Sequence, residues 1–358
     1  MRFYIGTYTK LVGNVSKGIY MADLCPESGE ISSLRLVAEI ENPSFLALHP
    51  HRPLLYSVSE LGQGDDGPLG SVSAFDIDLK SGSLALINTQ RVNGTAPCHL
   101  VVDATGRHLL SASYGSGTVC TMPITESGGL AAMTTHVQHE GSSVNPSRQE
   151  AAHAHSINLD AANRFALVCD LGADKTYVYR FDSDSGTLTA NSPDGISSAP
   201  GAGPRHLAYH PGGRFAYVIN ELDGTMNAYG YAPEAGRLTE IQTLSTLPEG
   251  WEGETSCADV HVDAAGRFLY GSNRGHDSVV IYEIDASTGR LTLVGHESTG
   301  GKTPRNFAID PTGEFLLAAN QDSDSLVVFK RDPAAGTLVA TGSVCDVPAP
   351  ICIQFTGR

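Results

Sequence analysis

Pro304–Gln321, with the sequence PRNFAIDPTGEFLLAANQ, is the clearest copy of a unit that recurs along this chain. It reads as a short apolar strand, a turn that contains Gly313, and a second apolar strand ending in polar residues. The two ends of the chain hold the halves of one more unit, because Pro350–Arg358 supplies only the first strand and Met1–Thr7 only the second. Pairing these strands would close the chain into a ring and remove the free edges of an open β-array.

The repeat has a regular period. Its complete copies lie at Pro43–Glu60, Pro97–Tyr114, Ala154–Asp170, Pro204–Glu221, Cys257–Arg274 and Pro304–Gln321. Their last residues are 54, 56, 51, 53 and 47 positions apart, which suits one four-stranded sheet per repeat better than a helical hairpin. Together with the split unit this gives seven repeats. The sequence therefore predicts an all-β fold: a seven-bladed β-propeller, closed by its N- and C-terminal strands, as a single domain over residues 1–358.

Strand and turn signals within the repeats support this prediction. Ser278–Ile284 and Ser325–Lys330 are rich in apolar residues that favour strands. Each is followed by a segment with a glycine near its end, Asp285–Leu291 and Asp332–Leu338, which is typical of a hairpin turn. No amphipathic helical pattern of any length competes with the strands.

Composition limits the partners and the compartment. The formal net charge is -16 and the pI is about 5.1, which argues against nucleic acid or an anionic membrane as a partner. Seven cysteines without a C-x-x-C pair indicate a reducing compartment. Because Met1–Lys10 lacks the apolar core of a signal peptide and no segment could span a bilayer, we expect a cytoplasmic protein that is a monomer or a weak homo-oligomer.

The polar ends of the repeats predict a functional site. In a propeller the same strand ends of all blades face one mouth of the central channel, so residues far apart in sequence converge there. At these ends the repeats carry a mixed polar set: Glu60, Tyr114, Asp170, Glu221, Arg274 and Gln321. The alternative is that they are turn residues which satisfy strand-end backbone groups, but Glu221 and Arg274 are costly to place in a narrow channel unless they are paired.

The starts of the repeats add a second ring of candidates. His99, His155, Arg205 and Arg305 lie at similar positions, and arginines concentrated in this way in an acidic protein indicate a local anion site. His155 follows the long polar loop Gly141–Glu150, which contains Arg148, and long loops without structure are usually functional.

Other histidines in the repeats have simpler explanations. His49, His210 and His261 fit structural hydrogen-bonding roles. His153 and His155 could share a metal, but no third ligand is evident, so we expect neither metal nor cofactor.

The motifs taken together resemble a known family. They are Gly6–Thr9, Asn42–Leu46, Arg148–Glu150 followed by Ala152–Ser156, Asp170–Gly172, Gly203–Leu207, Asn220–Leu222 and Ser272–Ser278. From end to end the chain is similar to the lactonase family of seven-bladed propellers, which includes propeller-type 6-phosphogluconolactonases and fungal carboxymuconate cyclases. What the resemblance implies is a catalytic site of His155, Arg205, Glu221 and Arg274. The other polar residues singled out above are candidates for binding substrate: Glu60, His99, Tyr114, Arg148, Asp170, Arg305 and Gln321.

The expected activity is hydrolysis of a sugar lactone, and of 6-phosphogluconolactone before others, which would place the enzyme in carbohydrate metabolism, in the pentose phosphate pathway. Hydrolysis of a cyclic ester needs a base to activate water and positive charge for the oxyanion. Glu221 or His155 would be the base, and Arg205 or Arg274 would stabilise the oxyanion. The other arginines, Arg305 among them, would hold an anionic group of the lactone.

Three alternatives stay open. The same residues would serve a muconate-type cyclase. A propeller that only binds proteins is a second alternative, although the single tryptophan, Trp251, and the missing Gly-His…Trp-Asp signature argue against it. The third is a metal-dependent gluconolactonase, which would be a propeller of six blades.

Overall fold

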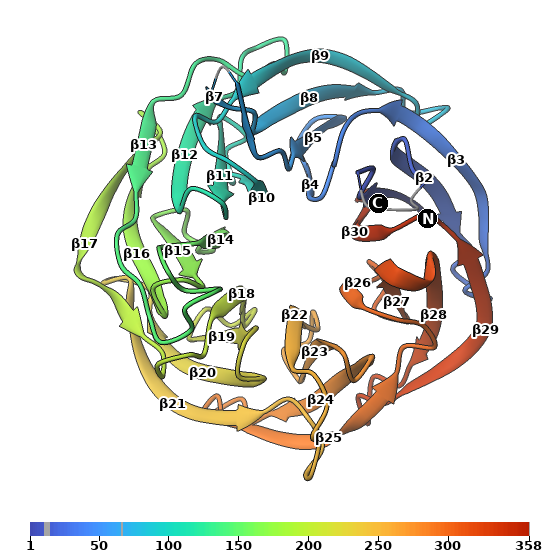
Figure 1. Cartoon of the computed structure of the whole chain (residues 1–358). Helices are drawn as coiled ribbons and strands as arrows, with labels where there is room; N and C mark the ends of the chain where they lie inside the picture. Colours follow the sequence, from blue (N-terminus) through green and yellow to red (C-terminus); the bar gives the residue numbers. More distant parts are fainter. Residues whose placement is uncertain (11–14, 66, 358) are drawn as a thin grey trace.

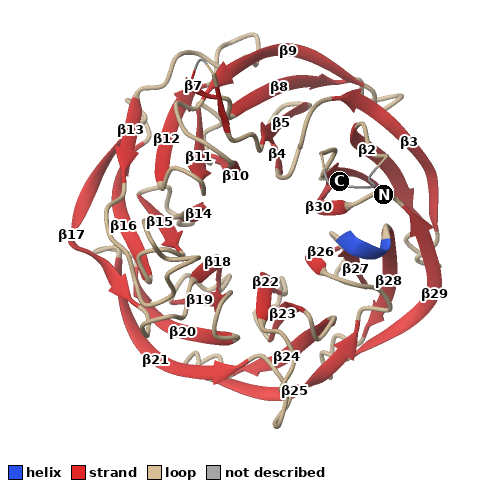
Figure 2. Cartoon of the chain, in the orientation of Figure 1, coloured by secondary structure: helices blue, strands red, loops and turns tan. Residues whose placement is uncertain are grey.

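The computed structural model describes residues 1–10, 15–65 and 67–357. These residues form seven four-stranded antiparallel sheets around a central axis, which confirms the seven-bladed β-propeller (Figure 1). In the described part of the chain the 3₁₀ helix η1 (Gln321–Ser323) is the only helix (Figure 2), and no helix is long and apolar enough to cross a membrane.

Each blade runs from an inner strand at the axis to an outer strand at the rim. The inner strands are β4 (Leu46–Leu48), β10 (Pro97–Val102), β14 (Ala154–Leu159), β18 (Pro204–Tyr209), β22 (Ser256–Val262), β26 (Pro304–Ile309) and β30 (Pro350–Phe355). The second strands are β5 (Leu54–Ser59), β11 (His108–Ser113), β15 (Phe165–Asp170), β19 (Phe215–Asn220), β23 (Phe268–Arg274), β27 (Phe315–Asn320) and β1 (Arg2–Thr7).

The outer half of each blade is less buried. The third strands are β8 (Ser71–Ile77), β12 (Thr118–Pro123), β16 (Lys175–Asp182), β20 (Thr225–Ala232), β24 (Ser278–Ile284), β28 (Ser325–Arg331) and β2 (Gly18–Leu24). The rim strands are β9 (Leu84–Arg91), β13 (Thr135–Gln138), β17 (Thr187–Ser197), β21 (Arg237–Ser245), β25 (Leu291–Ser298), β29 (Leu338–Asp346) and β3 (Ile31–Glu39). A small hairpin, β6 (Gln63–Gly64) and β7 (Gly67–Pro68), projects from one blade.

The two chain ends meet in one blade, as the split repeat predicts. β30 pairs antiparallel with β1, so that Phe3 lies opposite Phe355 and Ile5 opposite Ile353. Phe3, Ile5 and Ile353 are buried in one apolar cluster with residues of β27 and β28 from the neighbouring blade. The closing strand therefore contributes both ladder hydrogen bonds and apolar burial to the ring.

The apolar core lies between adjacent blades and leaves the axis to polar side chains. Tyr217 and Ile219 of β19, for example, pack against Leu269 and Tyr282 of the next blade. The Tyr217 hydroxyl also donates a hydrogen bond to the carbonyl of Gly289, in the hairpin turn that the sequence predicts. Gly289 has a φ of +72°, and a Cβ there would lie 2.4 Å from the Phe215 ring, so both backbone conformation and space require glycine.

We expect Ile353→Ala to lower the free energy of unfolding by about 2–5 kcal/mol, because it empties a buried position in the closing strand. Val339→Ala is the matched control, since Val339 lies on the rim strand β29 and is 67% exposed, and it should change stability by less than about 0.5 kcal/mol. Urea unfolding followed by circular dichroism measures both. Equal effects of the two substitutions would contradict the closing role of β30.

Candidate active site

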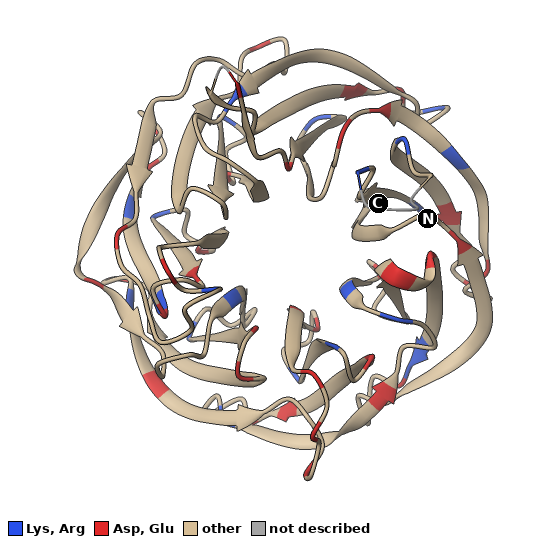
Figure 3. Ribbon diagram, in the orientation of Figure 1, with Lys and Arg blue, Asp and Glu red and all other residues tan. Residues whose placement is uncertain are grey.

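A repeated irregularity aims side chains into the channel. Near the start of the inner strands β10, β14, β18, β26 and β30 the pairing register shifts by one residue, so that Cys98, His155, Arg205 and Arg305 are skipped in the first four, and Ile351 in β30. Such β-bulges re-aim the extra side chain. The bulges place a thiol, an imidazole and two guanidinium groups around the axis, and Figure 3 shows basic ribbon segments at the inner ends of β18 and β26.

A second ring comes from the residue at the end of each second strand: in β23 this is the last residue of the strand, Arg274, and in the other blades it is the residue that follows the strand. Its backbone N–H binds the carbonyl just before the inner strand of the same blade, as in Glu60 to Asn42, Tyr114 to Ala96 and Glu221 to Gly203. In the blade of β15 the residue in this position is Leu171, which binds His153, and not Asp170. In the closing blade it is Tyr8, which binds Ala349.

The two rings enclose a cavity of about 290 Å³ at one mouth of the channel. Its lining is Glu60, Cys98, Tyr114, Arg148, His155, Glu221, Ser256, Arg274 and Arg305. Arg205 lies beside it and borders a smaller void of about 10 Å³. The structure thus brings together His155, Arg205, Glu221 and Arg274 with four of the predicted substrate-binding residues, namely Glu60, Tyr114, Arg148 and Arg305.

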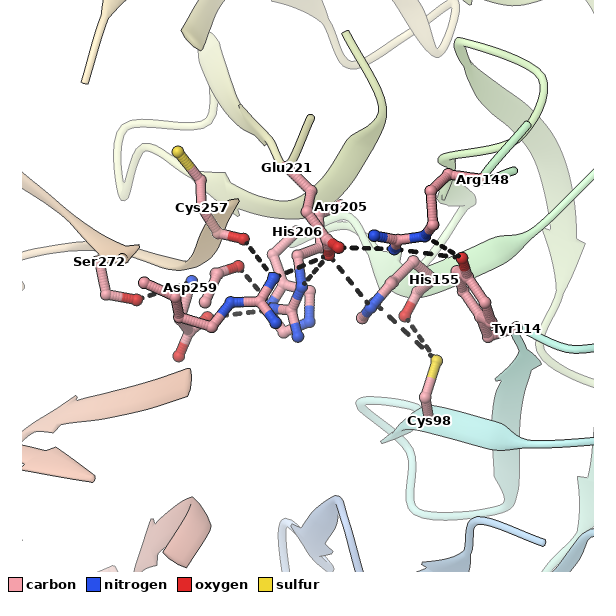
Figure 4. A network of polar contacts seen from close by, with 12 residues as sticks. Cys98, Tyr114, Arg148, His155, Arg205, His206, Glu221, Cys257, Asp259 and Ser272 are labelled. Carbon is pink, nitrogen blue, oxygen red and sulfur yellow. Dashed lines mark hydrogen bonds and ion pairs between the residues drawn. The ribbon is translucent and has the colours of Figure 1, made fainter. Parts of the chain in front are cut away.

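Glu221 is the centre of the charged network (Figure 4). Its Oε2 accepts Arg205 Nε at 2.9 Å and lies 3.0 Å from Arg274 Nη2, and its Oε1 accepts Arg148 Nη2 at 2.6 Å. Burial alone would raise the pKa of Glu221, but the three positive charges outweigh it and hold the pKa well below its usual range. Glu221 is therefore ionised at neutral pH, with both carboxylate oxygens occupied.

Arg205 and Arg274 are also fixed by backbone carbonyls of β22. Arg205 Nη1 donates to Ala258 at 2.6 Å, and Arg274 Nη2 donates to Cys257 at 2.8 Å. Burial, together with the neighbouring arginines, lowers the pKa of Arg205 to about 10, so the group stays protonated at neutral pH. Two rigid positive charges therefore stand beside the cavity.

His155 is buried close to these charges and also contacts two uncharged side chains. Its Nε2 lies 4.0 Å from Glu221 Oε2, its Nδ1 lies 3.8 Å from Cys98 Sγ, and its ring meets Tyr114 edge to face at 5.6 Å. Burial lowers the pKa of His155 well below its usual value, and Arg205 and His206 lower it further. The imidazole is consequently neutral at physiological pH and can accept a proton.

Arg305 differs from the other cavity arginines. Its guanidinium lies over the Tyr8 ring at 5.3 Å, but it makes no side-chain hydrogen bond to any residue that the structure describes. Tyr8 in turn donates to both oxygens of Glu60, at 3.0 and 2.9 Å. Arg305 thus keeps its N–H donors available in the cavity.

Arg148 reaches the cavity mouth from the long loop that the sequence singled out. Its Nε and Nη2 each lie 3.2 Å from the Tyr114 hydroxyl, and 40% of its side chain is exposed. Asp170 anchors both ends of this loop: it binds His139 Nδ1 at 2.7 Å and the backbone N–H of His153 at 2.8 Å. Asp170 therefore supports the loop from within the protein and does not line the cavity.

Two other predicted binding residues lie outside the cavity. His99 is buried deeper in the channel, with its ring tilted against that of Phe45 at a centroid distance of 4.2 Å, and borders a hollow at the opposite face. Gln321 begins η1 and donates to its neighbour Asp322 at 2.7 Å. Conversely, the sequence analysis missed Tyr8, which its place in the split repeat could have indicated.

The side chain of His153 packs against Tyr114. Its ring stacks on Tyr114 at 4.5 Å, and its Nδ1 lies 2.9 Å from the Tyr114 carbonyl oxygen. Across residues 1–10, 15–65 and 67–357 there is no group of three or more His, Cys, Asp or Glu side chains placed to hold a metal ion.

Comparison with known proteins identifies the family. The model of the family described as lactonase, seven-bladed β-propeller, matches residues 2–355. The chain belongs to this lactonase family. The seven sheets exclude a six-bladed propeller, which the metal-dependent gluconolactonase considered from the sequence would have been.

Relatives and solved structures are similar over most or nearly all of the chain. The chain is 38% identical to the 6-phosphogluconolactonase of Bacillus subtilis, with 98% of this chain and 97% of the relative covered. It is 37% identical to a 6-phosphogluconolactonase of Formosa agariphila, with 86% and 85% covered. Among structures, the periplasmic gluconolactonase of Pseudomonas aeruginosa is 33% identical, with a TM-score of 0.92 and 99% of each chain covered.

We expect Glu221→Gln to destabilise the protein at pH 7 by about 3–5 kcal/mol, because Arg205 and Arg274, which are largely shielded from solvent, lose their counter-charge together with the more exposed Arg148. The folded pKa of Glu221 lies below its unfolded value, so its contribution is complete above about pH 4.5 and is lost as the pH falls through the folded pKa. Thermal unfolding at several pH values should show wild type and variant converging in acid.

The control for this prediction is Glu234→Gln. Glu234 also binds an arginine, Arg164, at 2.8 Å, but its side chain is 83% exposed, and the melting temperature should stay close to that of wild type. If the melting temperatures of Glu221→Gln and wild type did not converge in acid, the assignment of Glu221 as the buried counter-ion would be refuted.

Proposed function

We propose that this protein hydrolyses a phosphorylated sugar lactone, 6-phosphogluconolactone, to 6-phosphogluconate. The names of its relatives support lactone hydrolysis, and the seven free thiols suit a cytoplasmic site for it, which cell fractionation would test. The observation that carries the choice of substrate is the charge of the cavity. Among the described residues that line the cavity and the small void beside it, only Glu60 and Glu221 are negatively charged. Four are positively charged: Arg148, Arg205, Arg274 and Arg305.

Four arginines and two glutamates leave an excess of two positive charges beside a neutral imidazole. A phosphomonoester carries about −1.5 to −2 charge at pH 7 and would balance this excess. An unphosphorylated gluconolactone carries no charge and would leave it unbalanced. A muconate dianion has a similar charge, so an assay with both substrates separates lactonase from cyclase.

His155 is the base in the mechanism that we propose. Glu221 is unsuited to this role, since its oxygens already accept three guanidinium donors and its pKa is depressed. His155 is neutral and lies at the cavity wall. It takes a proton from water as the oxygen attacks the lactone carbonyl, and returns the proton to the ring oxygen when the C–O bond breaks.

The arginines have two different roles in this mechanism. Arg205 and Arg274 are held rigidly by Glu221 and the β22 carbonyls, so they can stabilise the oxyanion without rearrangement. Arg305 has free donors and binds the phosphate, with Arg148 at the mouth completing the contact. Glu221 serves as the counter-ion that keeps these groups in place.

Arg305→Met should raise KM for 6-phosphogluconolactone by about 10–100-fold, which corresponds to losing hydrogen bonds to a charged group, while KM for gluconolactone changes little. Arg237→Met is the matched control, because Arg237 is an exposed arginine on the rim strand β21. Initial rates corrected for spontaneous hydrolysis measure both. An equal change in KM for the two lactones would show that Arg305 does not bind the phosphate.

His155→Gln should lower kcat by about 10²–10⁴-fold, as expected for a lost general base, and leave KM within about threefold. Because burial and the arginines depress the pKa of His155, the wild-type rate should also stay constant as the pH falls through 6.5, where an ordinary histidine would become half protonated. A wild-type kcat in the variant would exclude His155 as the base, and an acid limb at pH 6.5 would contradict the lowered pKa of the base.

A further inference from the structure

A second polar layer lies directly beneath His155. His206, the residue after the bulge in β18, has its ring 5.3 Å from that of His155. Its Nδ1 lies 2.8 Å from Oδ1 of Asp259 on the neighbouring strand β22. Both side chains are buried, and Figure 4 shows both residues in the polar network around His155, so an Asp–His pair stands under the base of the proposed reaction.

The surroundings of Asp259 fix the protonation of this pair. Asp259 Oδ2 accepts Asn306 Nδ2 at 2.5 Å and lies 2.9 Å from His261 Nε2, and its Oδ1 also accepts the Val260 N–H at 2.9 Å. Burial would raise the pKa of Asp259, but the neighbouring histidines hold it well below its usual value. The carboxylate is therefore ionised, and His206 must donate its Nδ1–H to it.

His206 consequently presents an unprotonated Nε2. Within the described ranges no residue hydrogen-bonds that nitrogen. Burial and the charge of Arg205 lower the pKa of His206 to about 4 in spite of Asp259, so the ring is neutral at physiological pH. The titratable and charged groups packed around it are Arg205 on its own strand, Asp259 and His261 on β22, His155 on β14 and His99 on β10.

A small void connects the two histidines. It has a volume of about 10 Å³, and both His155 and His206 line it with Glu60, Arg205 and Arg305. This is about the space that one water molecule requires, and the lining supplies several polar partners for it. A water there would bridge the floor of the cavity to His206 Nε2.

We propose that His206, oriented by Asp259, is a proton-holding residue behind His155 in lactone hydrolysis. The inference rests on the proposed function. His155 alone lacks a carboxylate partner at hydrogen-bond distance, since Glu221 is 4.0 Å away and shared by arginines. An imidazolium at His155 would face these positive charges unassisted, whereas one at His206 contacts Asp259 directly.

The attacking water forms the bond to the carbonyl carbon and gives one proton to His155. The proton passes through the bridging water to His206 Nε2, and the Asp259 carboxylate stabilises the resulting imidazolium. When the ring C–O bond breaks, the proton returns by the same route to the leaving alkoxide oxygen, and both histidines are neutral again.

His206→Asn tests this role, because the Asn amide can still donate to Asp259 while the Nε2 acceptor is lost. We expect kcat for 6-phosphogluconolactone to fall by about 10–10²-fold with KM within about twofold. Wild-type rates in mixtures of light and heavy water should depend on deuterium content along a curve, since more than one proton moves. In His206→Asn the dependence should become linear.

Asp259→Asn should show the same loss of kcat, whereas His136→Asn is the matched control. His136 is an exposed histidine on the rim strand β13 and lies outside the proposed pathway, so the kcat of this variant should stay within about threefold of wild type. A wild-type kcat and a curved isotope plot in His206→Asn would overturn the proposal.

A direct measurement does not depend on the variants folding. Long-range proton–nitrogen NMR of the wild-type protein at pH 7 should find His206 with its proton on Nδ1 and Nε2 bare; a proton on Nε2 would overturn the proposal. If wild type does not hydrolyse the lactone, the proposed function fails and this role fails with it. If wild type is active and His206→Asn equally so, only the role of His206 is wrong.

Discussion

The attraction of one buried carboxylate for three guanidinium groups is the interaction on which the site depends. Arg205 is buried and only 12% of the Arg274 side chain is exposed, and charges in such positions are unfavourable unless they are paired. Glu221 supplies the pairing, and the carbonyls of Ala258 and Cys257 accept further N–H groups. The arrangement holds positive charge beside His155 without further rearrangement, which is the condition for stabilising an oxyanion effectively.

This interaction in turn requires the geometry of the ring. His155, Arg205 and Arg274 come from β14, β18 and β23, and Glu221 directly follows β19; they meet only because the blades surround a common axis (Figure 1). Closure by β1 and β30 keeps the blades at that radius. The bulges then turn side chains toward the axis that a regular ladder would have directed elsewhere.

Much of this architecture was predictable from the sequence because it depends on the period of the sequence repeat. The repeat length predicted the blades, the half-units at the chain ends predicted closure, and the glycine turns appear where expected. Asp170 was misplaced because the register of its blade could not be read to one residue: Leu171, not Asp170, occupies the position equivalent to Glu221. A slip of one residue reverses the direction of a side chain in a strand. The Asp259–His206 contact joins two blades, and no spacing in a single repeat predicts it.

The local charge of the cavity opposes the charge of the whole molecule. The chain carries a formal charge of -16, and acidic residues are spread around the ring (Figure 3), whereas the cavity has an excess of two positive charges. Because exposed charges are screened beyond about 8 Å at physiological ionic strength, an anionic lactone would feel the cavity only near its mouth. Hydrolysis adds a carboxylate, so on the proposed reaction the product carries more negative charge than the cavity excess can balance. The surrounding negative potential then favours its release.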